Sequence, residues 1–124
     1  NDSARVCYEK ALSLSPRNHT IQNNLGTLFF IQQDYAKALD LFKRAVELDP
    51  NYADGQSNFG STYGVLQQYD RALVHLLKAA ELDPDNAQIL NSLGTTYRFK
   101  GDERNAVLYF EKAYSINPAL RPKS

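Results

Sequence analysis

One sequence pattern recurs at a constant interval along this chain of 124 residues, and it constrains the fold more than any other feature. Four equally spaced prolines share one phase of the pattern, and each follows an apolar and then a polar residue: Pro16, Pro50, Pro84 and Pro118. Proline disfavours helix in the residue before it and cannot continue one, so each should mark the end of a helix. A fixed period of roughly 34 residues is typical of proteins built from stacked helical units.

The segment before each proline carries a small–large–small pattern. Two alanines stand seven residues apart, with a large side chain four residues after the first. The four sets are Ala4, Tyr8 and Ala11; Ala38, Phe42 and Ala45; Ala72, Leu76 and Ala79; and Ala106, Phe110 and Ala113. Spacings of four and three place each set on one helical face. The pattern predicts that two helices approach closely around one bulky side chain.

A second helix is expected ahead of each of the last three, because Gly26, Gly60 and Gly94 are separated by the same interval as the prolines. Glycine within a helix costs about 1 kcal/mol relative to alanine. Its recurrence at one phase indicates that a neighbouring helix passes too close for a side chain. Asp34 and Asp102 fall at the turn between the two helices, where each is expected to cap the second one.

These phased residues resemble the tetratricopeptide repeat, a helix–turn–helix unit with this period. We divide the chain into the second helix of a truncated repeat, three full repeats and a tail: 1–16, 19–52, 53–86, 87–120 and 121–124. The chain departs from the family pattern at two places. The first aromatic of each repeat is replaced, by Gln22, Gln56 and Leu90 in turn. The glycine of the turn between the helices is kept once, as Gly101, and the first two repeats carry Gln33 and Gln67 there instead.

The resemblance implies an all-α fold, a right-handed superhelical solenoid of antiparallel helix pairs with a single helix in front. In this family the first helix of each pair lines a concave groove. Helices are expected near 2–14, 19–32, 35–48, 53–66, 69–82, 87–99 and 103–116.

The charge balance is neutral, with 14 basic and 14 acidic residues. Nucleic-acid binding needs a basic surface, so nucleic acid is not an expected partner. No apolar run approaches the roughly 20 residues of a membrane span, so membrane insertion is not expected either. Cys7 is the only cysteine, which is compatible with a reducing compartment and favours a cytoplasmic location.

No constellation for catalysis is evident in the sequence. His19 and His75 are the only histidines, and neither has a second histidine or a cysteine at metal-ligand spacing. We expect both to be surface or edge residues, and Cys7 to be a buried, inert thiol. The sequence therefore indicates a binding protein rather than an enzyme, with no cofactor and no metal.

The resemblance places small, polar, uncharged side chains in the groove. They are Asn23, Asn24 and Thr27; Ser57, Asn58 and Ser61; and Asn91, Ser92 and Thr95. An asparagine amide both donates and accepts, so it can pair with the main chain of a bound segment whatever its sequence. We expect such contacts above all from Asn24, Asn58 and Asn91. The alternative is that all nine residues form solvated helix surface.

One subclass of the family holds a partner's terminal carboxylate with basic residues and asparagines. Asn58 matches one of those asparagines, but the positions expected to be basic carry Asn23, Gln88 and Ser92, so that clamp is not expected. Gln88 and Arg98 complete the predicted peptide-binding set. An edge of the groove that is mostly apolar is expected from Phe30, Ile31, Val65, Phe99 and Arg98, and helix packing is an equally good interpretation for Ile31, Val65 and Phe99.

The leading hypothesis is a module that binds a protein partner through an extended peptide. A second hypothesis is a scaffold that self-associates through uncovered repeat ends, since a repeat stack needs covered ends to stay soluble. At the C-terminal end, an exposed apolar patch is expected from Tyr109, Ala113, Ile116 and Leu120. A third hypothesis is the targeting segment of a larger enzyme.

Overall fold

The computed structural model describes residues 2–123, which form seven α-helices, one short 3₁₀ helix and no strand. The helices are α1 (Asp2–Leu14), α2 (His19–Ile31), α3 (Tyr35–Leu48), α4 (Ala53–Val65), α5 (Tyr69–Leu82), α6 (Ala87–Lys100), α7 (Glu103–Ile116) and η1 (Pro118–Leu120). Each α-helix begins and ends within one residue of its predicted range. The all-α prediction is therefore confirmed.

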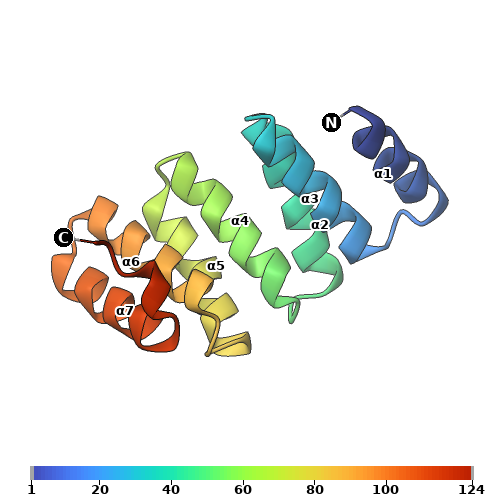
Figure 1. Cartoon of the computed structure of the whole chain (residues 1–124). Coiled ribbons are helices and arrows are strands. Elements are labelled where there is room, and N and C mark those ends of the chain that lie inside the picture. The colour runs from blue at the N-terminus through green and yellow to red at the C-terminus, as the bar shows by residue number, and fades with distance from the viewer. Residues whose placement is uncertain (1, 124) are drawn as a thin grey trace.

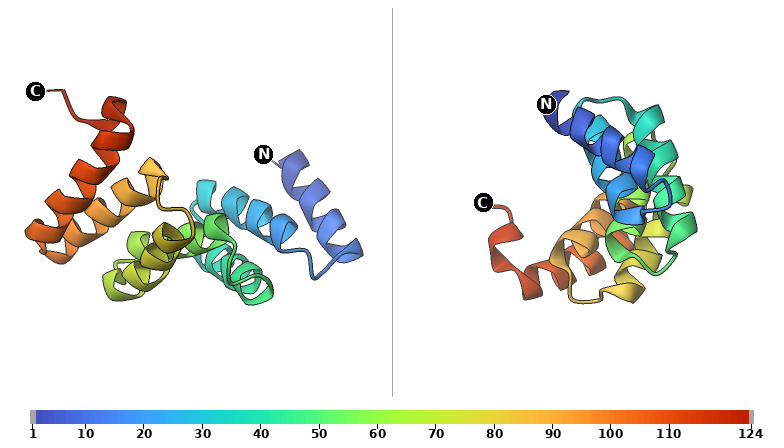
Figure 2. Two further views of the ribbon diagram at one scale, coloured as in Figure 1. Left: turned by 90° about the horizontal axis from the view of Figure 1, so that it is seen from below. Right: turned by 90° about the vertical axis from the view of Figure 1, so that its right-hand side faces the viewer.

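The helices form a single row of antiparallel pairs (Figure 1). The closest pairs are α2 with α3, α4 with α5, and α6 with α7, and successive pairs meet through α3 with α4 and α5 with α6. Helix α4 also contacts α2 and α6, whereas α3, α5 and α7 do not contact one another within the described residues. The row is consequently curved, with α2, α4 and α6 on its inner side; Figure 2 shows the curvature.

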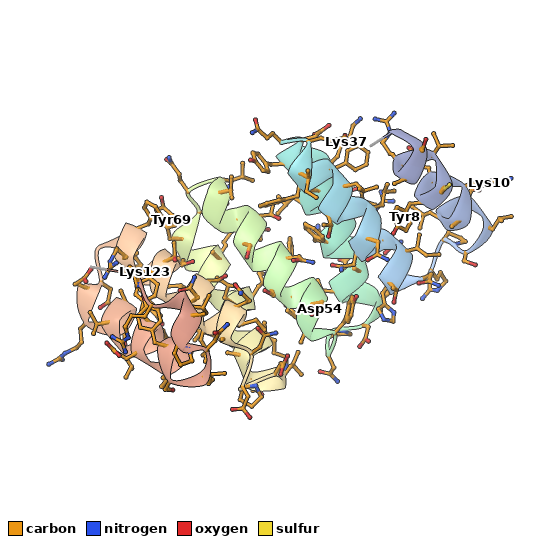
Figure 3. The ribbon with its side chains drawn as sticks, viewed as in Figure 1. Tyr8, Lys10, Lys37, Asp54, Tyr69 and Lys123 are labelled. Atoms are coloured by element: carbon orange, nitrogen blue, oxygen red, sulfur yellow. The ribbon has the colours of Figure 1, made fainter. Side chains whose placement is uncertain are left out.

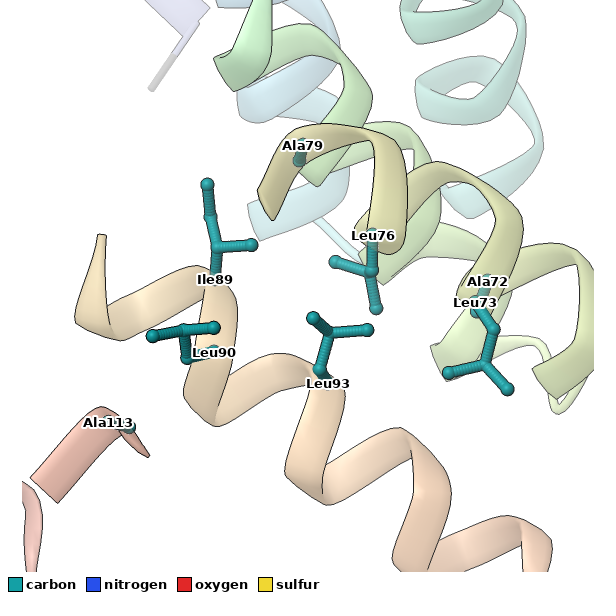
Figure 4. Close-up of a cluster of buried hydrophobic side chains, with 8 residues drawn as sticks. All are labelled: Ala72, Leu73, Leu76, Ala79, Ile89, Leu90, Leu93 and Ala113. Atoms are coloured by element: carbon teal, nitrogen blue, oxygen red, sulfur yellow. The ribbon is translucent and has the colours of Figure 1, made fainter. Parts of the chain in front are cut away.

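The alanines and large residues of the two middle sets of the repeated pattern are buried between the helices, whereas the first set and Phe110 are partly buried. Phe42 and Leu76 are among the largest side chains that are fully buried, and the flanking alanines are buried with them. In Figure 4, Leu76 of α5 and Leu93 of α6 point toward one another. Full burial of such a side chain contributes about 1.5–3 kcal/mol relative to exposure, so this face holds each pair on its neighbour.

The three phased glycines lie where the helices of a pair touch. An added Cβ would stand 2.7 Å from the Phe42 ring at Gly26, 2.8 Å from Leu76 Cγ at Gly60, and 2.8 Å from the Phe110 ring at Gly94. At Gly60 it would also stand 2.9 Å from the backbone oxygen of Ala72, which cannot rotate away as a side chain can. The sequence-based explanation of these glycines is confirmed.

A fourth helical glycine, Gly64, has a different environment. A Cβ at Gly64 would meet only Ala72 Cβ at 3.9 Å and Thr96 Oγ1 at 4.0 Å, which are ordinary van der Waals distances. Helix packing therefore requires glycine at Gly60 but not at Gly64, one turn later on α4.

Alanine substitutions should have opposite effects at these two positions. Gly60→Ala should lower the free energy of unfolding by about 1–3 kcal/mol through overpacking. Gly64→Ala should raise it by about 1 kcal/mol, because alanine is the better helix former and has room. Urea unfolding of the parent and both variants measures the difference. Equal midpoints for the two variants would contradict the close approach at Gly60.

Helix caps support the predicted boundaries. Asp34 and Asp102 accept hydrogen bonds from the backbone N–H groups of Lys37 and Asn105, at 3.4 Å and 3.2 Å. Hydrogen bonds from the side chain and backbone of Asn105 hold the pKa of Asp102 below its usual value. Both caps were expected from the sequence.

The turns between paired helices contain left-handed backbone. Gly101 has φ 94°, but the same position is occupied by Gln33 with φ 65° and Gln67 with φ 64°. A left-handed conformation costs a residue with a Cβ roughly 1–2 kcal/mol, and glycine avoids that cost. The two glutamines that replace the family's turn glycine are therefore strained.

Gln67→Gly should relieve this strain and stabilise the chain by about 1 kcal/mol, which raises the melting temperature by a few degrees. Gln67→Ala is the matched control, because it removes the same side chain but keeps the unfavourable φ. Thermal unfolding followed by circular dichroism compares the two. An equal rise in both variants would show that the glutamine side chain, not its backbone, is the source of the cost.

The C-terminal end differs from the expected exposed patch. Ala113 is fully buried in the cluster that contains Leu90, so the expectation of an exposed Ala113 is wrong. Tyr109 and Leu120 are partly buried against the same cluster, because η1 follows α7 and packs back on it. Ile116 is exposed as expected. Self-association through the ends stays a prediction.

Candidate functional site

Two adjacent hollows lie on the inner side of the curve, and together they are called the concave groove here. The α2/α4 hollow has a volume of about 300 Å³ and is lined by Thr27, Phe30, Phe42, Asn58 and Ser61. The α4/α6 hollow has a volume of about 420 Å³ and is lined by Ser61, Gly64, Val65, Gln67, Tyr69, Asn91, Ser92, Thr95, Thr96 and Phe99. Ser61 lines both, so the two hollows adjoin at this residue of α4.

Six of the eleven predicted binding residues line this groove: Thr27, Asn58, Ser61, Asn91, Ser92 and Thr95. The other five do not line either hollow: Asn23, Asn24, Ser57, Gln88 and Arg98. Asn24 and Ser57 are partly buried on the same helices, and Gln88 is exposed in the first turn of α6. Arg98 is directed to its own helix pair, where it makes two hydrogen bonds to Glu103 and lies over the Phe110 ring.

A chain of hydrogen bonds orients Asn58. Its Nδ2 donates to Oδ1 of Asn23 at 3.0 Å, and Nδ2 of Asn23 donates to the hydroxyl of Tyr52 at 3.4 Å. Burial and nearby Asp54 raise the pKa of Tyr52, so its hydroxyl stays neutral. No hydrogen bond within the described part of the chain uses Oδ1 of Asn58. Asn58 therefore holds a fixed orientation with its carbonyl oxygen available to a ligand.

The threonine hydroxyls of the groove already use their protons in hydrogen bonds within the chain. Thr27, Thr95 and Thr96 each donate to the backbone carbonyl four residues earlier, at 3.0, 3.0 and 2.8 Å. A hydroxyl has one proton, so a hydroxyl that already donates can only accept from a ligand. The three threonines therefore offer acceptors only, whereas Ser61, Asn91 and Ser92 in the same groove can both donate and accept.

Charge is nearly absent from the groove helices. Helix α2 contains no lysine, arginine, aspartate or glutamate, and α4 contains only Asp54. In Figure 3, Asp54 lies at the opposite end of α4 from Tyr69. The two cations of α6 are paired, Arg98 with Glu103 and Lys100 with Asp70. Binding here depends on neutral hydrogen bonds and apolar contact rather than on ion pairs.

The predicted apolar edge is exposed rather than packed in the core. Ile31, Val65 and Phe99 are 70%, 46% and 68% exposed, so the packing alternative is wrong for these three residues. The ring of Tyr69 stacks on Phe99 at a centroid distance of 6.0 Å. Val65, Tyr69 and Phe99 thus form an apolar wall on one side of the α4/α6 hollow.

Six groove or supporting residues were not identified from the sequence as part of the site: Phe42, Tyr52, Gly64, Gln67, Tyr69 and Thr96. Two of them left a signal. Gly64 is a helical glycine outside the phase of Gly26, Gly60 and Gly94, and Thr96 occupies the same place in its repeat as Thr62 does in the repeat before. Tyr52 gave no comparable signal, because its bond to Asn23 joins side chains 29 residues apart.

Cys7 and His75 lie elsewhere than expected. Cys7 is exposed, so the prediction of a buried thiol is wrong; α1 packs on its neighbours through Tyr8 and Leu12 instead. His75 is half-buried beneath Phe59 and Tyr63, and its Nδ1 lies 2.9 Å from Oε1 of Gln56. Nε2 of Gln56 donates to the Pro50 carbonyl, so its oxygen is the acceptor and His75 the donor.

No three histidine, cysteine, aspartate or glutamate side chains among the described residues are grouped to hold a metal ion. Within the same residues, no helix has the length and apolar character needed to cross a bilayer.

Comparison with known proteins identifies the family. Tetratricopeptide repeat models match residues 20–52 and 51–119, so the chain belongs to the tetratricopeptide repeat family. A crystal structure of MamA superimposes with a TM-score of 0.83 at 26% identity, over 93% of this chain and 67% of that one. A second MamA crystal structure gives 0.84 at 25% identity, over 99% and 69%. A search of curated proteins finds no match. The chain is thus a repeat module for protein–protein interaction.

Acid should destabilise the fold partly through His75. Burial lowers the pKa of His75 below its usual value near 6.5, so the folded state disfavours the imidazolium. This contribution to stability is present above pH about 6.5 and is lost as the pH falls below it. We expect the parent's melting temperature to fall more steeply from neutral to mildly acid pH than that of His75→Leu.

Leucine is a suitable replacement because Leu41 holds the corresponding place one repeat earlier. There the oxygen of Gln22 is buried without a partner, so the variant reproduces an arrangement that the chain already tolerates. The two proteins are compared by the slope of melting temperature against pH. Loss of the hydrogen bond to Gln56 should shift the melting temperature of the variant by a similar amount at every pH, so it does not change the slope. Parallel slopes would show that His75 does not titrate with unfolding.

Proposed function

We propose that this module binds an extended segment of a partner protein along the concave groove and contacts its main chain through neutral amides and hydroxyls. The orientation of Asn58 carries the proposal. Its amide is held by Asn23, and its carbonyl oxygen has no partner in the described part of the chain. Asn58 is half-buried and this oxygen is open to solvent, so it is a preoriented acceptor that a ligand's N–H can reach.

The polarity of the groove fits a peptide backbone. An extended peptide presents N–H groups along both of its edges, and these can donate to Asn58 and to the threonine hydroxyls. The second N–H of the Asn58 amide remains to donate to a peptide carbonyl. These acceptors suit the N–H groups of a peptide, and the side chains of Ser61, Asn91 and Ser92 can donate to its carbonyl groups.

The predicted residues have different parts in this proposal. Direct contact is assigned to the six residues that line the groove, and Asn23 acts indirectly by holding Asn58. Asn24, Ser57 and Gln88 flank the groove on the same helices. Arg98 is paired with Glu103, so it leaves no unpaired charge at the edge of the groove and is assigned no direct contact with the peptide.

The proposal is tested with peptides selected from a random displayed library against the parent protein. Asn58→Ala should weaken their binding by roughly twofold to tenfold, since a neutral hydrogen bond contributes about 0.5–1.5 kcal/mol. Added salt should change the affinity little, because no charged clamp takes part. Calorimetric titration of parent and variant at low and high salt measures both effects.

Two controls separate binding from stability. Asn58→Ala also strands Oδ1 of Asn23, which is 5% exposed, so some loss of stability is expected. Gly60→Ala loses stability without lining the groove, and Asn51→Ala makes the same chemical change on an exposed turn; both should bind as the parent does at temperatures where they are folded. Parent-like affinity in Asn58→Ala would refute the proposal, and a steep loss of affinity with salt would indicate a charged site instead.

A further inference from the structure

Gly64 is not explained by the packing of the helices. A side chain there would meet no atom closer than 3.9 Å, whereas Gly60 on the same helix leaves no room for one. Gly64 lies in the last turn of α4, where alanine would still be the better helix former, so packing alone gives no reason for a glycine at this position.

The missing side chain at Gly64 leaves space in the groove. The corresponding positions in the repeats before and after carry Phe30 and Arg98. The Phe30 ring packs on Tyr35 at 5.3 Å, and Arg98 is bound to Glu103. Of the three groove helices, only α4 has no side chain at this position, and the hollow of about 420 Å³ lies beside it.

The lining of this α4/α6 hollow combines two chemistries. The stacked rings of Tyr69 and Phe99 lie within 8° of parallel and form the apolar wall with Val65. The hydroxyls of Thr95 and Thr96, on the same helix as Phe99, accept but do not donate, and Asn91 and Ser92 can do both. No ionised side chain lines the hollow, and nearby Lys100 is paired with Asp70.

We propose that the α4/α6 hollow is a socket for one aromatic side chain of the bound segment that carries a hydrogen-bond donor at its tip, a tyrosine or a tryptophan. This inference rests on the proposed function and adds the residue that sets the register of the peptide. An aromatic body contacts the apolar wall, and its O–H or N–H reaches a threonine oxygen. A charged side chain would lose its hydration without gaining an opposite charge.

The socket is tested with small probes that do not depend on the rest of the groove. N-acetyl-tyrosinamide, N-acetyl-phenylalaninamide and N-acetyl-lysinamide are titrated while the amide signals of Gly64, Thr96 and Phe99 are followed by NMR. The tyrosine derivative should bind several-fold more tightly than the phenylalanine derivative, and the lysine derivative should bind most weakly. No shift with the tyrosine derivative, or preference for either other probe, would overturn the proposal.

Variants locate the effect. Gly64→Leu fills the hollow and should abolish the shifts caused by all three probes. Thr96→Val keeps the shape but removes the acceptor, so it should lower the affinity for the tyrosine derivative to that for the phenylalanine derivative. Unchanged binding in either variant would refute the socket. If circular dichroism shows that Gly64→Leu does not fold, Phe99→Ala replaces it and should weaken the tyrosine derivative several-fold.

The result is separable from the test of main-chain binding. Asn58 lines the α2/α4 hollow and not the socket, so Asn58→Ala should leave the response to the tyrosine derivative unchanged. A socket that fails while Asn58→Ala still weakens the selected peptides would reject the aromatic preference alone. The converse result would reject the main-chain contacts alone.

Discussion

The close approach of one helix to its partner at the phased glycines is the constraint on which the rest of the structure depends. At Gly60 the approach is limited by backbone atoms of α5, and at Gly26 and Gly94 by the Phe42 and Phe110 rings. This contact holds the two helices of each pair close together, and successive pairs then meet through α3 with α4 and α5 with α6. Because α4 touches α2 and α6 while the outer helices stay apart, the curvature and the inner groove follow from the same contact.

The fold and most groove-lining positions were predictable because their signals are periodic, whereas the contacts within the site were not, because they join side chains far apart in the sequence. Proline, alanine and glycine phases each recur at least three times, which specifies the helices to within a residue. Phase also placed Thr27, Asn58 and Ser61 in the groove. The repeat phase could not show that the Asn23 side chain is hydrogen-bonded to Asn58 and Tyr52, since those bonds join side chains 35 and 29 residues apart. Cys7 was misplaced for a similar reason: its exposure depends on which face of α1 meets the neighbouring helices.

Gly64 shows how a departure from the repeat can carry information about the site. Where the repeat is obeyed, a residue's type is explained by packing, and its presence says little about ligands. Gly64 breaks the phase, is not required by its neighbours, and weakens its helix. The strained turn at Gln67, which lines the same hollow, is a second local cost at this place. Local features that lower the stability of the fold without a packing reason are expected at functional sites.

The two parts of the groove suit two different tasks. Contacts to a main chain are tolerant of sequence, because every peptide bond offers the same donor and acceptor. With Asn58 alone, a bound segment could therefore shift its register by two residues and make the same contacts. A single socket between α4 and α6 removes that freedom, since only the register that places an aromatic side chain beside Phe99 fills it. The groove helices carry almost no charge, so neither task relies on long-range attraction. Specificity in such a groove therefore follows from shape and hydrogen-bond polarity, and the absent side chain at Gly64 is the feature that provides the shape.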